Sequence, residues 1–191
     1  MLLRAVLLCA FALPASAEPY ASIQDRRPDL FHPETGYRIA RQRAPTPEDI
    51  PAPAQLVDAA EARALIEAGA LALDVYGASY SRFDELDGTW LVSEQRLSLP
   101  GALWLPETGR GTLNETMESY LRTNLAKATA GNRDHPLVVF CIADCWMSWN
   151  AAQRLSNLGY TQVYWYRLGT DGWRDEGWAL VPIDPVPVTV D

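Results

Sequence analysis

Apolar and polar residues follow one another along the chain in a pattern that predicts strands separated by helices. Short apolar runs at 70–76, 136–141 and 162–168 have the length of buried strands. The segment "LPGALWLP", residues 99–106, predicts a turn followed by a short strand. Strands that alternate with helices predict an α/β fold, in which a parallel sheet carries helices on both faces.

The segments between these strands carry residues typical of helix starts, helix faces and helix ends. In 56–69, which begins as a short strand or turn, Asp58 is a candidate N-cap, Glu61 stands where a capping box places it, and Gly69 ends the helix. The segment 114–129 is amphipathic, with Met117, Tyr120, Leu121 and Leu125 near one face. Two further helices are expected at 146–159 and 172–177, and an irregular segment at 77–98.

Residues 18–53, called the N-terminal arm below, differ from the rest of the chain in composition. They hold seven of the chain's fourteen prolines, which disfavour long helices and central strands. The arm also contains apolar residues, and "GYRIARQR" (36–43) alternates enough to predict a short edge strand. We therefore expect an arm that packs on the domain; the alternative is a disordered linker.

Residues 1–17 have the pattern of a secretory signal peptide. Arg4 precedes a short apolar run, and Ala15-Ser16-Ala17 forms a small-residue cleavage site. The expected divisions are therefore a signal at 1–17, the arm at 18–53 and one domain at 54–191. The predicted compartment is outside the cytoplasm, with the periplasm expected, and no later segment is apolar enough to predict a membrane span.

The charge of the chain restricts its partners. The net charge is −8 and becomes −9 if Arg4 leaves with the signal. An acidic surface repels nucleic acid and anionic membranes, so neither is an expected partner. The overall charge suits a basic protein partner or a small ligand.

The candidate chemistry lies in "VVFCIADCWMSWNAAQRL", residues 138–155. Cys141 ends a predicted strand, and the residues after it lead into a helix whose free N–H groups and dipole favour a negative charge. This position lowers the pKa of a cysteine and would hold a thiolate or persulfide, although Asp144 opposes the shift. Signal cleavage leaves only Cys141 and Cys145, so an oxidising compartment makes a disulfide between them possible.

The spacing of the two cysteines sets a condition for that bond. Two Cβ atoms four residues apart on a regular helix are about 5–6 Å apart, whereas a disulfide needs about 3.5–4.5 Å. The bond therefore requires a non-helical loop. Cys145 could then resolve a mixed disulfide formed at Cys141.

A Cu(I) site is the alternative use of the pair. The CxxxC spacing resembles the copper-binding loop of copper chaperones for cytochrome oxidase, and soft thiolates suit Cu(I). A third ligand would have to be Met147 or His32, because His135 lies about 20 Å away at the wrong end of the strand. We expect no cofactor and no zinc site, with Cu(I) as the open possibility.

The order of the segments resembles a rhodanese domain over residues 55–182. The resemblance is carried by "LDVY", "LPGALWLP", "VVFC", "NAAQRL" and "GYTQVYWYRLGTDGW". It implies that Cys141 is the nucleophile that accepts sulfane sulfur. "LFHPETGYRI", "CIADCWMSWNAA" and "GTDGW" are also similar to the secreted CXXCW-motif proteins associated with catabolism that depends on pyrroloquinoline quinone (PQQ).

The chain departs from the rhodanese pattern at the expected anion site. The loop "IADCWM" carries Asp144 and no cation, Tyr76 stands where a "DVR" arginine is usual, and Ser98 replaces a usual histidine. These changes predict that the entrance to the site at Cys141, called the mouth below, is acidic and poor in cations. Such an entrance disfavours the binding of thiosulfate, a dianion.

The sequence also predicts roles for other residues near the two cysteines. Asp74 either orients the site or makes a structural hydrogen bond, and Asp171 is a turn or cap residue. Trp146 packs in the core or walls a pocket or partner surface. The predicted loop and pocket residues are Ile142, Ala143, Asp144, Trp146, Met147 and Asp74, and a basic cluster of Arg38, Arg41 and Arg43 either faces solvent or anchors the arm.

These observations lead to one functional hypothesis and one alternative. The first is a periplasmic thiol protein accessory to a PQQ-dependent alcohol-oxidation system, with a dehydrogenase or cytochrome c as partner. Its activity would be thiol–disulfide exchange or sulfur transfer at Cys141 and Cys145. The alternative is a non-catalytic module that presents Trp146, the cysteine loop and the arm to a partner, with or without copper.

Overall fold

A computed structural model describes residues 18–189 of the chain. The predicted signal peptide lies outside the described residues. A five-stranded parallel sheet forms the centre, in the order β1-β6-β5-β2-β4. The strands are β1 (Gln55–Val57), β2 (Leu71–Asp74), β4 (Leu103–Trp104), β5 (Leu137–Phe140) and β6 (Val163–Tyr166). This confirms the predicted α/β fold.

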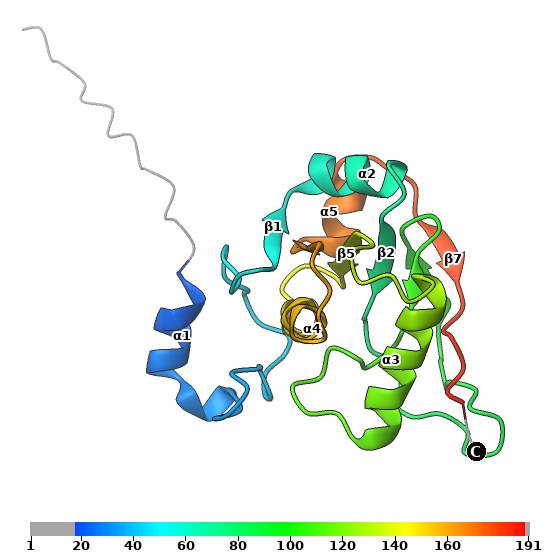
Figure 1. The fold of residues 1–191 in the computed structure, drawn as a ribbon, viewed down its shortest axis with the longest axis horizontal. Coiled ribbons are helices and arrows are strands. Elements are labelled where there is room, and N and C mark those ends of the chain that lie inside the picture. The colour runs from blue at the N-terminus through cyan, green and yellow to red at the C-terminus, as the bar shows by residue number, and fades with distance from the viewer. Residues whose placement is uncertain (1–17, 190–191) are drawn as a thin grey trace, which may run out of the picture.

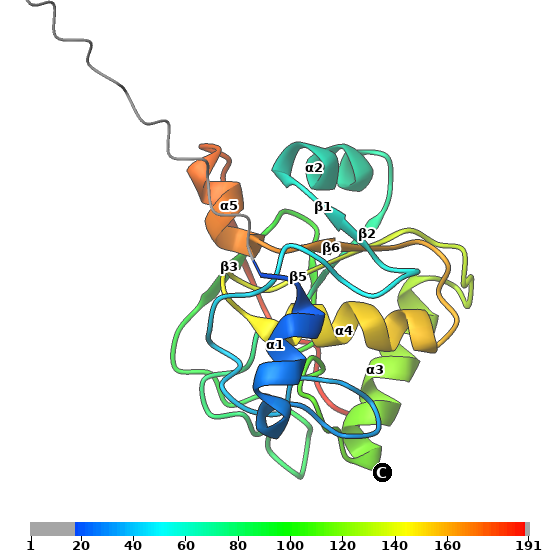
Figure 2. The same ribbon diagram turned by 90° about the vertical axis from the view of Figure 1, so that its left-hand side faces the viewer.

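Helices cover both faces of the sheet, as Figure 2 shows with the sheet seen from its edge. On one face lie α2 (Ala59–Glu67) and α5 (Gly169–Asp175). On the other lie α3 (Glu115–Ala128) and α4 (Trp146–Asn157), with the arm outside α4 (Figures 1 and 2). The predicted capping box of α2 is present, since Asp58 accepts from the Glu61 N–H and Glu61 accepts from the Asp58 N–H. No helix among residues 18–189 is long and apolar enough to cross a membrane.

Three details of the predicted pattern were wrong. A small antiparallel pair, β3 (Arg96–Ser98) with β7 (Val181–Ile183), was missed because Arg96 and Ser98 are polar and Pro182 disfavours a strand. The last helix, α5, begins at Gly169 instead of residue 172.

The third error is the edge strand at 36–43, where only the isolated bridges Phe31–Arg38 and Arg43–Cys145 form. Arg41 has a left-handed φ of 48°, which interrupts an extended ladder.

The arm packs against α4 along much of its length. It begins with α1 (Tyr20–Arg26) and the short 3₁₀ turn η1 (Pro28–Leu30). Tyr20 stacks obliquely on Trp149 of α4 at 5.6 Å, and the Trp149 indole N–H donates to the carbonyl of Asp49. Leu30 and Phe31 belong to the same buried cluster as α3 and α4.

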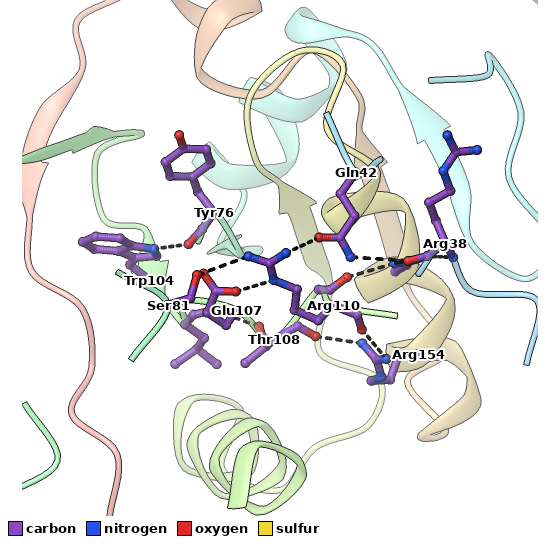
Figure 3. Close-up of polar contacts among 12 residues, drawn as sticks. Arg38, Gln42, Tyr76, Ser81, Trp104, Glu107, Thr108, Arg110 and Arg154 are labelled. Atoms are coloured by element: carbon purple, nitrogen blue, oxygen red, sulfur yellow. Dashed lines mark hydrogen bonds and ion pairs between the residues drawn. The ribbon is translucent and has the colours of Figure 1, made fainter. Parts of the chain in front are cut away.

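Two buried polar side chains one turn apart on α4 hold the arm and the 108–111 segment together. The Asn150 amide accepts from the Arg38 N–H at 2.7 Å and donates to the carbonyls of Arg38 and Gly109. The Arg154 guanidinium donates to the carbonyls of Thr108, Arg110 and Gly111, as Figure 3 shows in part. Both side chains therefore supply hydrogen-bond partners to backbone groups that lie outside helices and strands.

Replacing Asn150 by alanine should loosen the arm. The Arg38 N–H and two carbonyls lose their partner, so we expect a loss of about 1–3 kcal/mol in the free energy of unfolding. Urea unfolding measures that loss, and limited proteolysis should show faster cleavage within 18–53. The matched control is Asn124→Ala on α3, whose amide bonds only its own helix at Tyr120. Equal effects of the two substitutions would contradict this role of Asn150.

Candidate functional site

The carboxyl ends of the parallel strands meet at one edge of the sheet. Residues 141–145, called the cysteine loop below, begin there. Cys141 follows β5 directly, and β5 lies between β2 and β6 in the sheet. Such an edge is where open α/β sheets bind ligands. The residues at the ends of β2 and β6 therefore become neighbours of the loop.

The structure joins Cys141 to Cys145 in a disulfide, with Cα atoms 6.3 Å apart. The loop between them is not helical, as the spacing required. Asp144 has a left-handed φ of 53°, and Cys145 stands in extended geometry as the N-cap of α4. Both cysteines are buried, and neither makes a side-chain cap for the helix.

Residues at the start of α5 hold one side of the loop. The Thr170 N–H donates to the Cys141 carbonyl at 3.1 Å, and the Ala143 N–H donates to the Asp171 carboxylate at 3.0 Å. Gly169 has φ +53°, and a Cβ there would overlap the Cys141 carbonyl. Asp171, expected only as a turn or cap residue, is therefore a loop-holding residue.

The arm holds the other side of the loop through its backbone. The Ala44 N–H donates to the Asp144 carbonyl at 3.1 Å, and the Trp146 N–H donates to the Gln42 carbonyl at 2.9 Å. The Arg43 guanidinium donates to the Ala143 carbonyl at 2.8 Å. The N–H of Ala143 in the loop and the N–H of Trp146, the first residue of α4, are thus already bonded to protein oxygens.

Trp146 fastens the arm instead of facing a partner. Its side chain is fully buried, and its indole N–H donates to the Pro45 carbonyl. The Arg38 guanidinium lies 4.6 Å from the centre of the Trp146 ring and 5.0 Å from that of Phe31. Arg38 therefore anchors the arm by stacking on aromatic rings. The idea that Trp146 is presented to a partner was wrong, because no surface of it is exposed.

Asp74 lies at the end of β2 as the acceptor for three groups. Its carboxylate accepts from the Tyr76 N–H, the Ser98 hydroxyl and the Arg96 guanidinium, at 2.9, 2.6 and 2.9 Å. Burial raises the pKa of Asp74, while Arg96 and the hydrogen bonds act in the opposite direction. Arg96 also stacks on the Tyr76 ring at 4.4 Å and approaches the Cys141 carbonyl at 3.4 Å.

A groove of about 1290 Å³ opens beside the loop, and its lining corrects the predicted cation-poor mouth. The loop itself contributes Ile142 and Cys145, and α4 adds Met147, whereas Cys141 is not among the lining residues. Three carboxylates line the groove, Glu94, Glu107 and Asp171, against five arginines. The arginines are Arg41, Arg43, Arg96, Arg110 and Arg174. The cations were missed because they come from the arm, β3, α5 and the 105–111 segment instead of from the loop.

Hydrogen bonds connect the walls of the groove, as Figure 3 shows. Arg110 donates to the side chain of Gln42 in the arm at 2.7 Å and to the Ser81 hydroxyl at 3.2 Å, and it pairs with Glu107. The Trp104 indole N–H donates to the Tyr76 carbonyl at 2.7 Å. The arm is thereby fixed to the far wall as well as to α4.

A model of the rhodanese-like domain matches residues 58–176 of the chain. The chain belongs to the rhodanese-like domain family. No curated protein sequence matches it. The family match begins at the N-cap of α2 and does not include the arm, so the arm is an addition to the matched rhodanese-like region.

Three solved structures illustrate the similarity of this rhodanese-like domain to known folds. The polysulfide-sulfur transferase homodimer of Wolinella succinogenes is 15% identical, with a TM-score of 0.44 over 66% of this chain and 77% of that one. Thiosulfate sulfurtransferase of Pseudomonas aeruginosa is 25% identical, with a TM-score of 0.48 over 72% and 22%. An EanB variant in complex with hercynine is 18% identical, with a TM-score of 0.46 over 69% and 32%. The chain thus spans between about a fifth and a third of the length of the last two proteins.

Of the two candidates for a third copper ligand, only Met147 lies along the groove beside the cysteine loop. His32 lies in a turn of the arm, where its Nδ1 accepts from the N–H groups of Glu34 and Thr35. It does not line the groove, whereas Met147 does. Among residues 18–189, no group of three or more His, Cys, Asp or Glu side chains could hold a metal ion.

Removing the Arg96 cation should destabilise the domain in a way that depends on pH. Arg96→Met leaves the Asp74 carboxylate buried without its ion pair, a change that costs about 3–5 kcal/mol at neutral pH. The pKa of Asp74 then rises further above 3.8, its ordinary value. A raised folded-state pKa preserves stability below the unfolded-state pKa and loses it as the pH climbs through the folded-state value.

The difference in unfolding free energy between wild type and Arg96→Met should therefore grow from acidic to neutral pH, as urea titrations at several pH values can measure. Arg82→Met, at an exposed arginine, is the control and should show a small difference at every pH. A constant difference for Arg96→Met would show that Asp74 does not depend on Arg96 for its charge.

Proposed function

We propose that this chain is a thiol–disulfide protein built on a rhodanese-like domain, with Cys141 and Cys145 as its redox couple. The observation that supports this most strongly is the disulfide itself. It occupies the strand-end loop at which the resemblance implies a sulfur-accepting nucleophile. A bond across four residues restricts the unfolded chain little, so a chemical role explains the pair better than stabilisation does.

The hydrogen bonds of the loop favour a disulfide over a stored persulfide anion. An anion at Cys141 would be stabilised by free backbone N–H groups in the loop and at the start of α4. The N–H of Ala143 in the loop is bonded to the Asp171 carboxylate, and that of Trp146 at the start of α4 is bonded to the Gln42 carbonyl. A neutral disulfide needs no such donors, so the loop is matched to the oxidised pair.

The proposed reaction begins at Cys145, because Cys145 lines the groove and Cys141 does not. A thiolate of a partner dithiol attacks the Cys145 sulfur, the bond to Cys141 breaks, and Cys141 leaves as a thiolate. The second thiolate of the partner then attacks the mixed disulfide and releases Cys145. The partner is oxidised to a disulfide, the pair accepts two electrons, and the partner's two protons pass to the freed cysteine thiolates.

The wider role that we propose is accessory to a PQQ-dependent alcohol-oxidation system in the periplasm. Its support is the resemblance of "LFHPETGYRI", "CIADCWMSWNAA" and "GTDGW" to secreted proteins of that kind. The signal-like pattern of residues 1–17 supports the compartment, in which disulfides persist.

Sulfur transfer is a second candidate, supported by membership of the rhodanese-like family. In the reduced protein the Cys141 thiolate would take the outer sulfur of a persulfide donor and release the donor as a thiol. The two candidates differ in the next step. If the pair is a redox couple, Cys145 attacks the inner sulfur of Cys141, expels hydrosulfide and forms the disulfide.

Treatment of the reduced protein with glutathione persulfide separates these candidates. We expect wild type to release hydrosulfide and end as the disulfide, because Cys145 resolves the persulfide. Cys145→Ser cannot resolve a persulfide at Cys141 and should retain one added sulfur atom, and neither single-cysteine variant can form the disulfide. Intact mass and hydrosulfide assays measure these outcomes. A wild-type protein that keeps the added sulfur while Cys145 remains a free thiol would instead support sulfur transfer.

A further inference from the structure

The groove beside the disulfide has a charge opposite to that of the chain as a whole. The chain carries a net charge of −8, yet arginines outnumber carboxylates along the groove. Three of these arginines are already paired, Arg96 with Asp74, Arg110 with Glu107 and Arg174 with Asp171. The overall charge suggested a basic partner, but the surface beside Cys145 is suited to an acidic one.

The two remaining arginines lie on the arm segment that crosses the cysteine loop. Arg41 and Arg43 are both exposed, and neither pairs with a carboxylate of the described residues. The backbone of Arg43 is bridged to that of Cys145, the cysteine that lines the groove. Glu94 is the one groove carboxylate within residues 18–189 that has no cation partner, so the free cations outnumber it.

The size and the apolar part of the groove indicate a polypeptide as the ligand. Its volume of about 1290 Å³ exceeds that of pockets that enclose drug-sized molecules. Ile39 and Leu97 line it with 40% and 49% of their surfaces exposed. A small anion would use the arginines and leave both apolar side chains and most of the space unoccupied.

We propose that this groove binds an acidic polypeptide segment that also carries apolar side chains and the thiols that reduce Cys141–Cys145. This proposal rests on the proposed function and adds the chemistry of the partner. Glutamate or aspartate side chains would bind Arg41 and Arg43, apolar side chains would contact Ile39 and Leu97, and a cysteine thiolate would reach Cys145. The two-electron exchange is the one described above, with the segment as the dithiol.

Binding can be tested without redox chemistry. The protein is Cys141→Ser/Cys145→Ser, and the probe is a fluorescent, glutamate-rich peptide with one isoleucine and two cysteines capped by alkylation. Its twin has glutamine in place of glutamate. We expect the acidic peptide to bind at least about tenfold more tightly than its twin, with the difference shrinking at high salt. Equal binding of the two peptides, or binding of neither, would overturn the proposal whatever the disulfide does.

The reactive form of the same peptides tests whether binding leads to exchange. Their uncapped cysteines reduce the wild-type disulfide, and alkylation of the freed thiols measures the rate. The ratio of the acidic to the neutral peptide rate should fall roughly tenfold in Arg41→Gln/Arg43→Gln. Arg82→Gln/Arg122→Gln removes the same charge at exposed arginines outside the groove and should keep the ratio.

An equal fall in both double variants would show a general charge effect and overturn the groove as the site. If the acidic peptide binds the serine variant but reduces the wild-type protein no faster than its twin, the groove binds acidic segments and the thiol-partner part of the proposal is wrong.

Discussion

The site depends on keeping the five residues from Cys141 to Cys145 out of a helical conformation. Side chains four residues apart on a helix are too far apart for a disulfide, so the bond exists only while the loop is held open. Asp171 and Thr170 hold it from the α5 side, and the backbone of residues 42–44 holds it from the arm side. The arm, which the family match does not include, is therefore part of the site.

The same contacts also change the chemistry expected of the fold. The loop after a parallel strand and the start of the helix that follows it can offer N–H groups to an anion. Here the N–H groups of Ala143 and Trp146 bind protein oxygens instead. Arg38 lies against the rings of both Phe31 and Trp146 and fastens the arm, which supplies one of those oxygens. With these donors already bonded, the loop suits a neutral disulfide better than a persulfide anion. This is why we favour redox exchange over sulfur storage.

The strands and helices of the domain could be predicted because their patterns are local. Apolar runs mark β2, β5 and β6, and the capping box at Asp58 is encoded within four residues. The position of Cys141 followed from the same reasoning. The surroundings of the loop could not be predicted this way, because Arg43 and Asp171 reach Ala143 from 100 and 28 residues away. Arg96 reaches Cys141 across 45 residues, from a strand whose residues form no apolar run.

Charge shows the same limit. The net charge of −8 and the cation-free loop both predicted an acidic mouth, but folding gathers arginines from separate segments beside Cys145. An aspartate in a "GTDGW" turn looked like a turn or cap residue because its partner, the Ala143 N–H, is not a neighbour in the sequence. Long-range contacts of this kind decide what the cysteine pair can do.

Intact mass spectrometry of the protein, isolated from its native compartment with an alkylating reagent present throughout, tests the central claim most directly. We predict an unalkylated protein that is lighter than the dithiol form by two hydrogen atoms, which becomes doubly alkylated only after reduction. A protein heavier by one sulfur atom, or one alkylated at both cysteines without reduction, would contradict a resident Cys141–Cys145 disulfide.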